Sequence, residues 1–209
     1  VSELAGQSNI LSKAQEMGLD IGADGLKSRA VIDRIKELEH QGYQFEGADA
    51  SLELLLRDAY GDTKPVFTVD SYKILAEQKN EGMLSEAIVK ITVGEQQVYT
   101  VAEGNGPVNA LDNALRKALF PYYPGIRDIH LTDYKVRVLN EKDATAAKVR
   151  VLIESTDFKD TWSTVGVSSN VIEASWEALV DSIRYALLGM TRRDVSPESP
   201  REAFGWVNH

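Results

Sequence analysis

Apolar residues in the first third of the chain recur every three or four positions, which is the spacing of amphipathic helices. Three such segments can be read, with the apolar positions Ile10, Leu11, Ala14 and Met17, then Val31, Ile32, Ile35 and Leu38, then Leu52, Leu55, Leu56 and Ala59. Glycines or small polar residues separate them and can end the helices. Residues 1–62 are therefore predicted to form a small helical subdomain, closed by a turn near residues 61–64.

From Pro65 onward the apolar period changes from about four to two. Apolar and polar residues alternate in a pattern typical of strands, most clearly at Ala87, Val89, Ile91 and Val93. Strands are predicted near residues 67–74, 87–93 and 96–103, with a turn at Gly94. A helix is then predicted to begin at Pro107, where a missing N–H costs nothing, and to end near Leu119.

The same order recurs in the next part of the chain. Strands are predicted at residues 126–139, 145–153 and 161–166, followed by a helix over 170–188. At an offset of 64 the two parts also share residues: Thr100–Val101 with Thr164–Val165, Gly106 with Asn170, Val108 with Ile172, Ala110 with Ala174, and Ala114–Leu115 with Ala178–Leu179. Agreement of order and residues in one frame favours a tandem repeat over two unrelated stretches.

The predicted fold class is therefore α+β, with the helical subdomain followed by a domain of two βββα repeat units. This domain is predicted to span residues 65–190, with repeats at about 65–120 and 126–188. Residues 191–209 contain Pro197 and Pro200 and no apolar period, so they are expected to be a flexible tail.

The composition of the chain excludes several classes of site and partner. The chain has 209 residues, no cysteine and a formal net charge of −9, so disulfides and thiolate metal sites are excluded and binding to nucleic acid is electrostatically opposed. No apolar run approaches the roughly 20 residues of a membrane span. A cytoplasmic protein without a membrane or nucleic-acid partner is expected.

Residues for catalysis are sparse. His40, His130 and His209 are too scattered to suggest a metal site, and no grouping of a nucleophile with a base is present. His130 is expected to be structural rather than a ligand. Trp162 and Trp176 are expected to anchor a core or an interface. We therefore predict no catalytic residue and no cofactor in this chain.

Two segments nevertheless suit a ligand. Gly104, Asn105 and Gly106 join a strand to a helix, where backbone N–H groups favour a carboxylate or phosphate, although a tight turn alone explains the glycines. Asp133 could balance an ammonium group beside the ring of Tyr134, or be a surface acid. Residues 144–147 are small and leave room for a ligand or for close packing.

Several segments resemble the C-terminal part of the isopropylmalate, homocitrate and citramalate synthases, and most closely the citramalate branch. They are VSELAGQSN at 1–9, GYQFE at 42–46, GNGPVNALD at 104–112, DYKVRV at 133–138 and TVGVSSNVIEASW at 164–176. The resemblance covers nearly the whole chain except the tail. It implies a linker subdomain at 1–62 and, after it, a regulatory domain that forms a homodimer.

The resemblance also implies what the rest of such an enzyme does. An N-terminal TIM barrel, absent from this sequence, condenses acetyl-CoA with a 2-oxo acid and uses a divalent metal. This chain alone is expected to be inactive. The regulatory domain is expected to bind the pathway end product, isoleucine or leucine, for feedback inhibition; isoleucine is favoured because citramalate feeds its synthesis.

Carried over by position, the effector-binding residues implied by the resemblance are Gly104, Asn105, Gly106, Val108, Asp133, Tyr134, Val138, Ala144, Ala146 and Val167. The carboxylate suits the N–H groups near Gly106, the ammonium suits Asp133 or a backbone carbonyl, and the branched side chain suits the apolar members. Two alternatives remain: a purely structural dimerisation module and an independent enzyme.

Overall fold

The computed structural model describes residues 12–16, 18, 25–60, 65–79, 82–139 and 147–192. They fall into two compact units. The first contains the described parts of Val1–Lys64, Leu131–Ser155 and Asp160–Ser182, and the second those of Pro65–His130, Thr156–Lys159 and Ile183–His209.

Two helices form the α-helical part of the first unit. They are α2 (Gly25–Gln41) and α3 (Asp49–Tyr60), and residues 12–16 are also helical. The predicted apolar stripes become a core in which Val31, Ile35, Leu52 and Leu56 are buried together with Val165. Ile10, Leu11, Met17 and the predicted turn at 61–64 lie outside the described residues.

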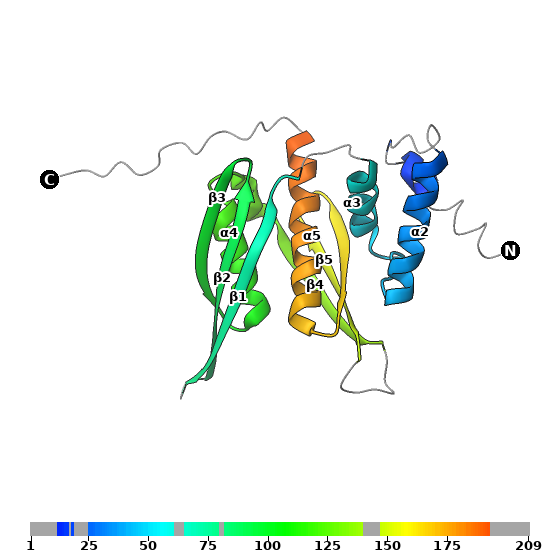
Figure 1. Ribbon diagram of the computed structural model, residues 1–209. Helices are drawn as coiled ribbons and strands as arrows, with labels where there is room; N and C mark the ends of the chain where they lie inside the picture. Colours follow the sequence, from blue (N-terminus) through cyan, green and yellow to red (C-terminus); the bar gives the residue numbers. More distant parts are fainter. Residues whose placement is uncertain are drawn as a thin grey trace. The chain divides into compact units, whose positions relative to one another are not determined.

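The first unit also holds an antiparallel sheet in the order β4-β5-β6. Its strands are β4 (His130–Val138), β5 (Val149–Thr156) and β6 (Thr161–Ser168). Helix α5 (Val171–Arg192) follows β6 directly, and its first half packs along this sheet (Figure 1). Trp162 and Trp176 are buried, as anchors of a core should be, and Trp162 Nε1 donates to Ser182 Oγ at 3.0 Å.

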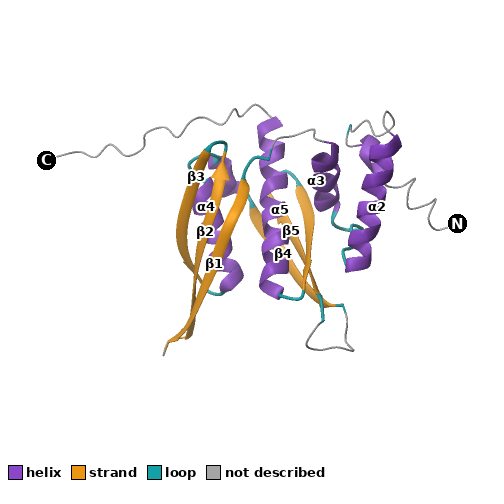
Figure 2. Cartoon of the chain, in the orientation of Figure 1, coloured by secondary structure: helices purple, strands orange, loops and turns teal. Residues whose placement is uncertain are grey.

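The second unit is built on an antiparallel sheet in the order β1-β2-β3. Its strands are β1 (Thr68–Lys79), β2 (Gly82–Val93) and β3 (Gln96–Gly104), and α4 (Pro107–Leu119) covers one face of it (Figure 2). Alternate residues of β2 are buried as the period of two predicts: Ser85, Ala87, Val89, Ile91 and Val93.

The order of three strands and one helix occurs twice, which confirms the α+β fold class and the βββα repetition. One hydrogen bond marks the repeat in side-chain detail. Thr100 Oγ1 donates to the carbonyl of Ala114 at 2.8 Å, and at the same offset of 64 residues Thr164 Oγ1 donates to that of Ala178 at 2.6 Å. Each third strand is thus fastened to the helix that follows it.

The predicted start of the fourth strand was wrong. Ile126 lies not in a strand but in a short 3-10 helix, η1 (Pro124–Asp128), and β4 begins at His130. Pro124 fixes its own φ angle and begins the turn, and the side chain of Ile126 is buried. The fifth strand begins at Val149 rather than Thr145, which lies outside the described residues.

At the C-terminal end, α5 extends to Arg192, beyond the predicted end near residue 188. The rest of the predicted tail, 193–209, lies outside the described residues. None of the described helices is long and apolar enough to cross a membrane.

Candidate functional site

The turn between β3 and α4 brings four of the predicted effector residues into one short segment. Helix α4 begins with Gly106 as its N-cap residue and Pro107 in its first turn, and no side chain caps it. The first N–H groups of a helix have no partner within the helix, so those at this end point out of α4. Val108, also in the predicted set, lies in this first turn.

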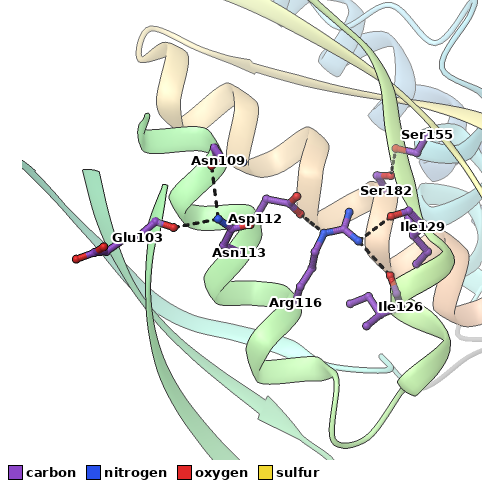
Figure 3. A network of polar contacts seen from close by, with 9 residues as sticks. All are labelled: Glu103, Asn109, Asp112, Asn113, Arg116, Ile126, Ile129, Ser155 and Ser182. Atoms are coloured by element: carbon purple, nitrogen blue, oxygen red, sulfur yellow. Dashed lines mark hydrogen bonds and ion pairs between the residues drawn. The ribbon is translucent and has the colours of Figure 1, made fainter. Parts of the chain in front are cut away.

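Two asparagines of α4 hold the turn in place (Figure 3). Asn113 Nδ2 donates to the carbonyl of Glu103 at 2.9 Å, as the figure shows. Asn109 Oδ1 accepts a hydrogen bond from the N–H of Asn105 at 3.1 Å. Gly104 lies so close to the helix that a Cβ there would be 2.4 Å from the nitrogen of Ala110. The glycine at 104 is therefore required by packing.

Gly106 is different from Gly104. Nothing lies within 4 Å of the position that its Cβ would occupy, and its φ of 174° is an extended conformation open to any residue. Neither packing nor backbone strain requires a glycine here. An open backbone at a helix N-terminus is what close approach by a carboxylate needs.

The corresponding end of α5 is closed by a side chain. Asn170, which occupies the position equivalent to Gly106, accepts a hydrogen bond from the N–H of Ile172 at 2.9 Å through Oδ1. The two repeats thus differ in how this helix end is capped, and of the two helices only α4 lacks a side-chain cap at its N-terminus. This asymmetry distinguishes the predicted carboxylate position from its counterpart.

Further along α4, Arg116 ties the helix to η1 (Figure 3). Its Nε donates to Asp112 Oδ1 at 2.7 Å, and its Nη1 donates to the carbonyls of Ile126 at 3.0 Å and Ile129 at 2.8 Å. Burial raises the pKa of the Asp112 carboxyl, and the guanidinium opposes that rise. Sequence reasoning missed this contact, although an Asp and an Arg four residues apart on a helix are a recognisable pair.

Strand β4 places the predicted residues Asp133 and Tyr134 on opposite faces, as successive residues of a strand must lie. Asp133 pairs with Lys135, with Oδ2 and Nζ 2.5 Å apart, and hydrogen bonding from Lys135 holds the pKa of Asp133 below its usual value. Tyr134 Oη lies 2.7 Å from Ser175 Oγ on α5. Because the Ser175 hydroxyl donates to the carbonyl of Val171, Tyr134 is the donor.

Val138 shares the face of Tyr134, four residues along the strand. Val167 does not, because it packs against the core cluster of α2 and α3 on the other side of the sheet. Its N–H donates to Glu177 Oε2 at 3.1 Å. Ala144 and Ala146 lie outside the described residues.

Glu177 connects that strand to the helical part of the same unit. Its other oxygen, Oε1, accepts a hydrogen bond from Tyr43 Oη at 2.5 Å. Burial raises the pKa of the Glu177 carboxyl, while the two donors lower it. Burial, together with Glu177, also raises the pKa of Tyr43. One carboxylate thus holds both the loop after α2 and the end of β6.

The same loop is fixed from β5. Arg150 donates through Nε to the carbonyl of Gly42 at 2.6 Å and through Nη1 to Gln44 Oε1 at 2.8 Å. Ser51 of α3 adds a contact to Asp181, at 2.9 Å, and accepts from the N–H of Val165. The helical part therefore has several polar contacts to the second repeat, none of which the sequence revealed.

The predicted effector residues are thus divided. Gly104, Asn105, Gly106 and Val108 belong to one compact unit, and Asp133, Tyr134, Val138 and Val167 to the other. The combined site stays a prediction. Among the described residues no cluster of three or more histidine, aspartate or glutamate side chains could hold a metal ion. His130, at the exposed start of β4, contacts the ring of Phe158 with centroids 4.7 Å apart.

Comparison with known proteins agrees with this architecture. Residues 46–187 match the LeuA allosteric (dimerisation) domain. The chain is 52% identical over 190 residues to the (R)-citramalate synthase of Aquifex aeolicus (strain VF5), a match that covers 90% of this chain and 36% of that protein. It is 49% identical over 189 residues to that of Geobacter sulfurreducens, with the same coverage.

A more distant relative carries a different name. The 2-isopropylmalate synthase of Methanocaldococcus jannaschii is 26% identical over 184 residues, covering 87% of this chain and 34% of that protein. The chain spans about a third of the length of the curated relatives it matches. The match to more than half of its residues, with the two βββα units, places the chain in the LeuA allosteric (dimerisation) domain family.

Proposed function

We propose that this chain is the C-terminal regulatory part of an acetyl-CoA-dependent synthase of the citramalate type, and that it dimerises and binds a branched-chain amino acid for feedback inhibition. The observation that carries the proposal is the match of residues 46–187 to an allosteric (dimerisation) domain within relatives that are (R)-citramalate synthases. Catalysis is assigned to a barrel that this sequence does not contain. The divalent metal and acetyl-CoA belong to that barrel.

The carboxylate of the amino acid is assigned to the turn before α4. The absence of a side-chain cap at Gly106 and the open space around it support this assignment. The positive end of the helix dipole favours an anion there. Leucine and isoleucine carry the same carboxylate, so this turn does not choose between them.

The branched side chain is assigned to the apolar surface that Tyr134 and Val138 expose on β4. Asp133 is the weaker part of the assignment, because it lies on the other face and already pairs with Lys135. A backbone carbonyl is then the better ammonium partner. Titration of an Asp133→Ala variant with isoleucine tests whether Asp133 binds the ammonium group. Binding as tight as in the parent excludes Asp133 as the ammonium partner, and a loss of binding supports it.

The choice of isoleucine rests on the citramalate relatives, since that amino acid is the end product of the pathway citramalate would feed. Leucine is the alternative, and the 2-isopropylmalate synthase relative supports it. The two ligands differ in the position of one methyl group. A pocket discriminates at that scale by only about 1–3 kcal/mol.

Inhibition requires the effector to favour one arrangement of the dimer. A coupling free energy of roughly 1–3 kcal/mol is typical of such regulation. The contacts of Tyr43 and Arg150 support a route through the helical part, because they fasten its loop to strands of the second repeat. The helical part would then carry the change towards the catalytic barrel.

Thermal unfolding tests the proposed effector binding. A ligand that binds only the native state stabilises it by an amount that grows with the ligand concentration. We expect isoleucine to raise the melting temperature in a saturable way, with smaller shifts from leucine and valine and none from glycine. If none of the branched amino acids shifts the transition, the chain is a purely structural dimerisation module.

A further inference from the structure

Ser85 of β2 carries a buried hydroxyl that has no hydrogen-bond partner. Among the described residues, its Oγ is the one buried side-chain nitrogen or oxygen atom without such a partner. The residue is 0% exposed, so bulk water does not reach the hydroxyl. Burial of an unpaired hydroxyl costs free energy, and native folds pair nearly all such groups. A hydroxyl kept unpaired in the free chain therefore suggests a partner that it gains in another state.

The register of the sheet places Ser85 beside the turn before α4. Ser85 pairs directly with Gly104 of β3, and opposite residues of an antiparallel pair have their side chains on the same face. That face is the one that α4 covers, because a Cβ at Gly104 would meet the backbone of Ala110. Ser85 also begins the row of buried residues on β2. Its hydroxyl therefore lies beside the first turn of α4, which has no side-chain cap.

A neighbour of Ser85 on that face is the side chain of Asn109. Gly104 has no side chain, and Asn109 Oδ1 lies 2.7 Å from the position that its Cβ would occupy. Opposite Cβ positions are about 5 Å apart, so a turn of the Asn109 amide brings Oδ1 within reach of the hydroxyl. In the free chain this oxygen accepts from the N–H of Asn105 at 3.1 Å. Asn113 Nδ2 approaches the same oxygen at 3.5 Å (Figure 3).

A carboxylate at this turn would compete with Asn109 for the same donor. The N–H of Asn105 forms a stronger hydrogen bond with a charged acceptor than with the neutral amide oxygen of Asn109. The displaced amide oxygen then needs another donor, and the unpaired hydroxyl of Ser85 can supply it. Binding of the carboxylate would thus pair two groups at once, the carboxylate with Asn105 and the Ser85 hydroxyl with Asn109.

We propose that Ser85 is a positioning residue for the amino-acid ligand. When the ligand carboxylate binds the turn, the Asn109 amide turns away from Asn105 and accepts a hydrogen bond from Ser85. This inference rests on the proposed binding of a branched-chain amino acid at this turn. Ser85 does not touch the ligand; it stabilises the conformation of Asn109 that leaves the N–H of Asn105 to the carboxylate.

Ser85→Ala tests this role, because it should change stability and affinity in opposite directions. Removal of an unpaired buried hydroxyl should raise the melting temperature of the free chain by about 2–4 °C. Calorimetric titration with isoleucine should show binding about 5-fold weaker, which is the size of one neutral hydrogen bond. A hydroxyl with a purely structural role would instead lower the melting temperature and leave the affinity unchanged.

Ser155→Ala is the matched control. Ser155 is also a buried serine on the middle strand of its sheet, but its Oγ accepts a hydrogen bond from Ser182 Oγ at 2.7 Å. This variant should therefore have a lower melting temperature than the parent and bind isoleucine with the same affinity. Circular dichroism checks that each variant folds like the parent.

A double variant tests the route through Asn109. In an Asn109→Ala chain, Ser85→Ala should weaken binding no further, because the two residues act as a pair. A Ser85→Ala chain that binds isoleucine as tightly as the parent, or that melts at a lower temperature, overturns the role of Ser85. A full loss in the Asn109→Ala background overturns the route through Asn109. A parent chain that binds no isoleucine contradicts the proposed function itself, and this inference with it.

Discussion

Removal of a single hydroxyl, in Tyr43→Phe, tests the connection between the helical part and the second repeat. Tyr43 Oη donates to Glu177 Oε1 at 2.5 Å, and no other atom of the ring is altered. The ring of Tyr43 stacks against Phe45 with centroids 6.0 Å apart, a contact that phenylalanine retains. The substitution therefore removes one hydrogen bond and leaves the packing in place.

The expected loss in the free energy of unfolding depends on the charge of the acceptor, Glu177. A hydrogen bond to an ionised group contributes about 1.5–3 kcal/mol, roughly twice a neutral one. Glu177 keeps the N–H of Val167 as a second donor, so its carboxylate is not left without a partner. We therefore expect the free energy of unfolding to fall by about 2 kcal/mol. For a chain of this length that corresponds to a melting temperature lower by about 4–8 °C.

Urea unfolding, followed by circular dichroism and by the fluorescence of the buried tryptophans, measures the loss. The protein concentration must be the same for all variants, because dimerisation makes stability depend on it. In Glu177→Gln the amide can donate to Tyr43 and accept from Val167, so this control should be close to the parent. If Tyr43→Phe unfolds within about 0.5 kcal/mol of the parent, which is the size of an ordinary surface change, the hydrogen bond to Glu177 does not stabilise the fold.

Four further outcomes are expected. Burial raises the pKa of Glu177, so the native state keeps this proton to a higher pH than the unfolded chain does. The free energy of unfolding should therefore fall as the pH rises above 4.5, the ordinary pKa of a glutamate. Glu177→Gln should remove this pH dependence when unfolding is measured in urea. Gly166→Ala would place a Cβ 2.0 Å from the carbonyl oxygen of Ala174 and should cost about 3 kcal/mol in the same assay. Arg116→Leu leaves two carbonyls without their donor and should cost about 2–3 kcal/mol. Gly106→Ala should leave stability unchanged but weaken isoleucine binding about 10-fold by calorimetry; unchanged binding would exclude the carboxylate from this turn.

The repeat could be predicted from the sequence because both of its signals are local. The change of apolar period from four to two identified the strands, and the offset of 64 residues aligned Thr100 with Thr164. The structure gives these two threonines the same hydrogen bond to the following helix. The apolar stripes of α2, α3, α4 and α5 were equally readable, because each buries one face.

Contacts between distant segments were not readable. Tyr43 and Glu177 are separated by 134 residues, and no periodicity links them. Arg116 gives a second example, since it donates to the carbonyls of Ile126 and Ile129. These residues were predicted to lie in a strand, but Ile126 lies in η1 and Ile129 directly follows it. In both cases a polar side chain satisfies a partner that only the tertiary fold brings near.

The effector residues show the same division. The glycine turn before α4 was recognisable as a strand-to-helix junction, and Gly106 was aligned with Asn170 as part of the repeat. That Asn170 caps its helix while α4 has no side-chain cap became visible only in the structure. Asp133 and Tyr134 were predicted to bind the same ligand side by side. Successive residues of a strand point to opposite faces of the sheet, so the two side chains do not share one surface. The alternation of side chains along a strand is sufficient by itself to separate these two residues.

Calorimetric titration of the chain with isoleucine tests the central claim most directly. We expect saturable heat at about one site per chain, with weaker binding of leucine and valine. A clear preference for leucine would move the parent enzyme towards isopropylmalate synthesis. No heat with any of the three, from folded and dimeric protein, would contradict the claim that this chain is an amino-acid sensor.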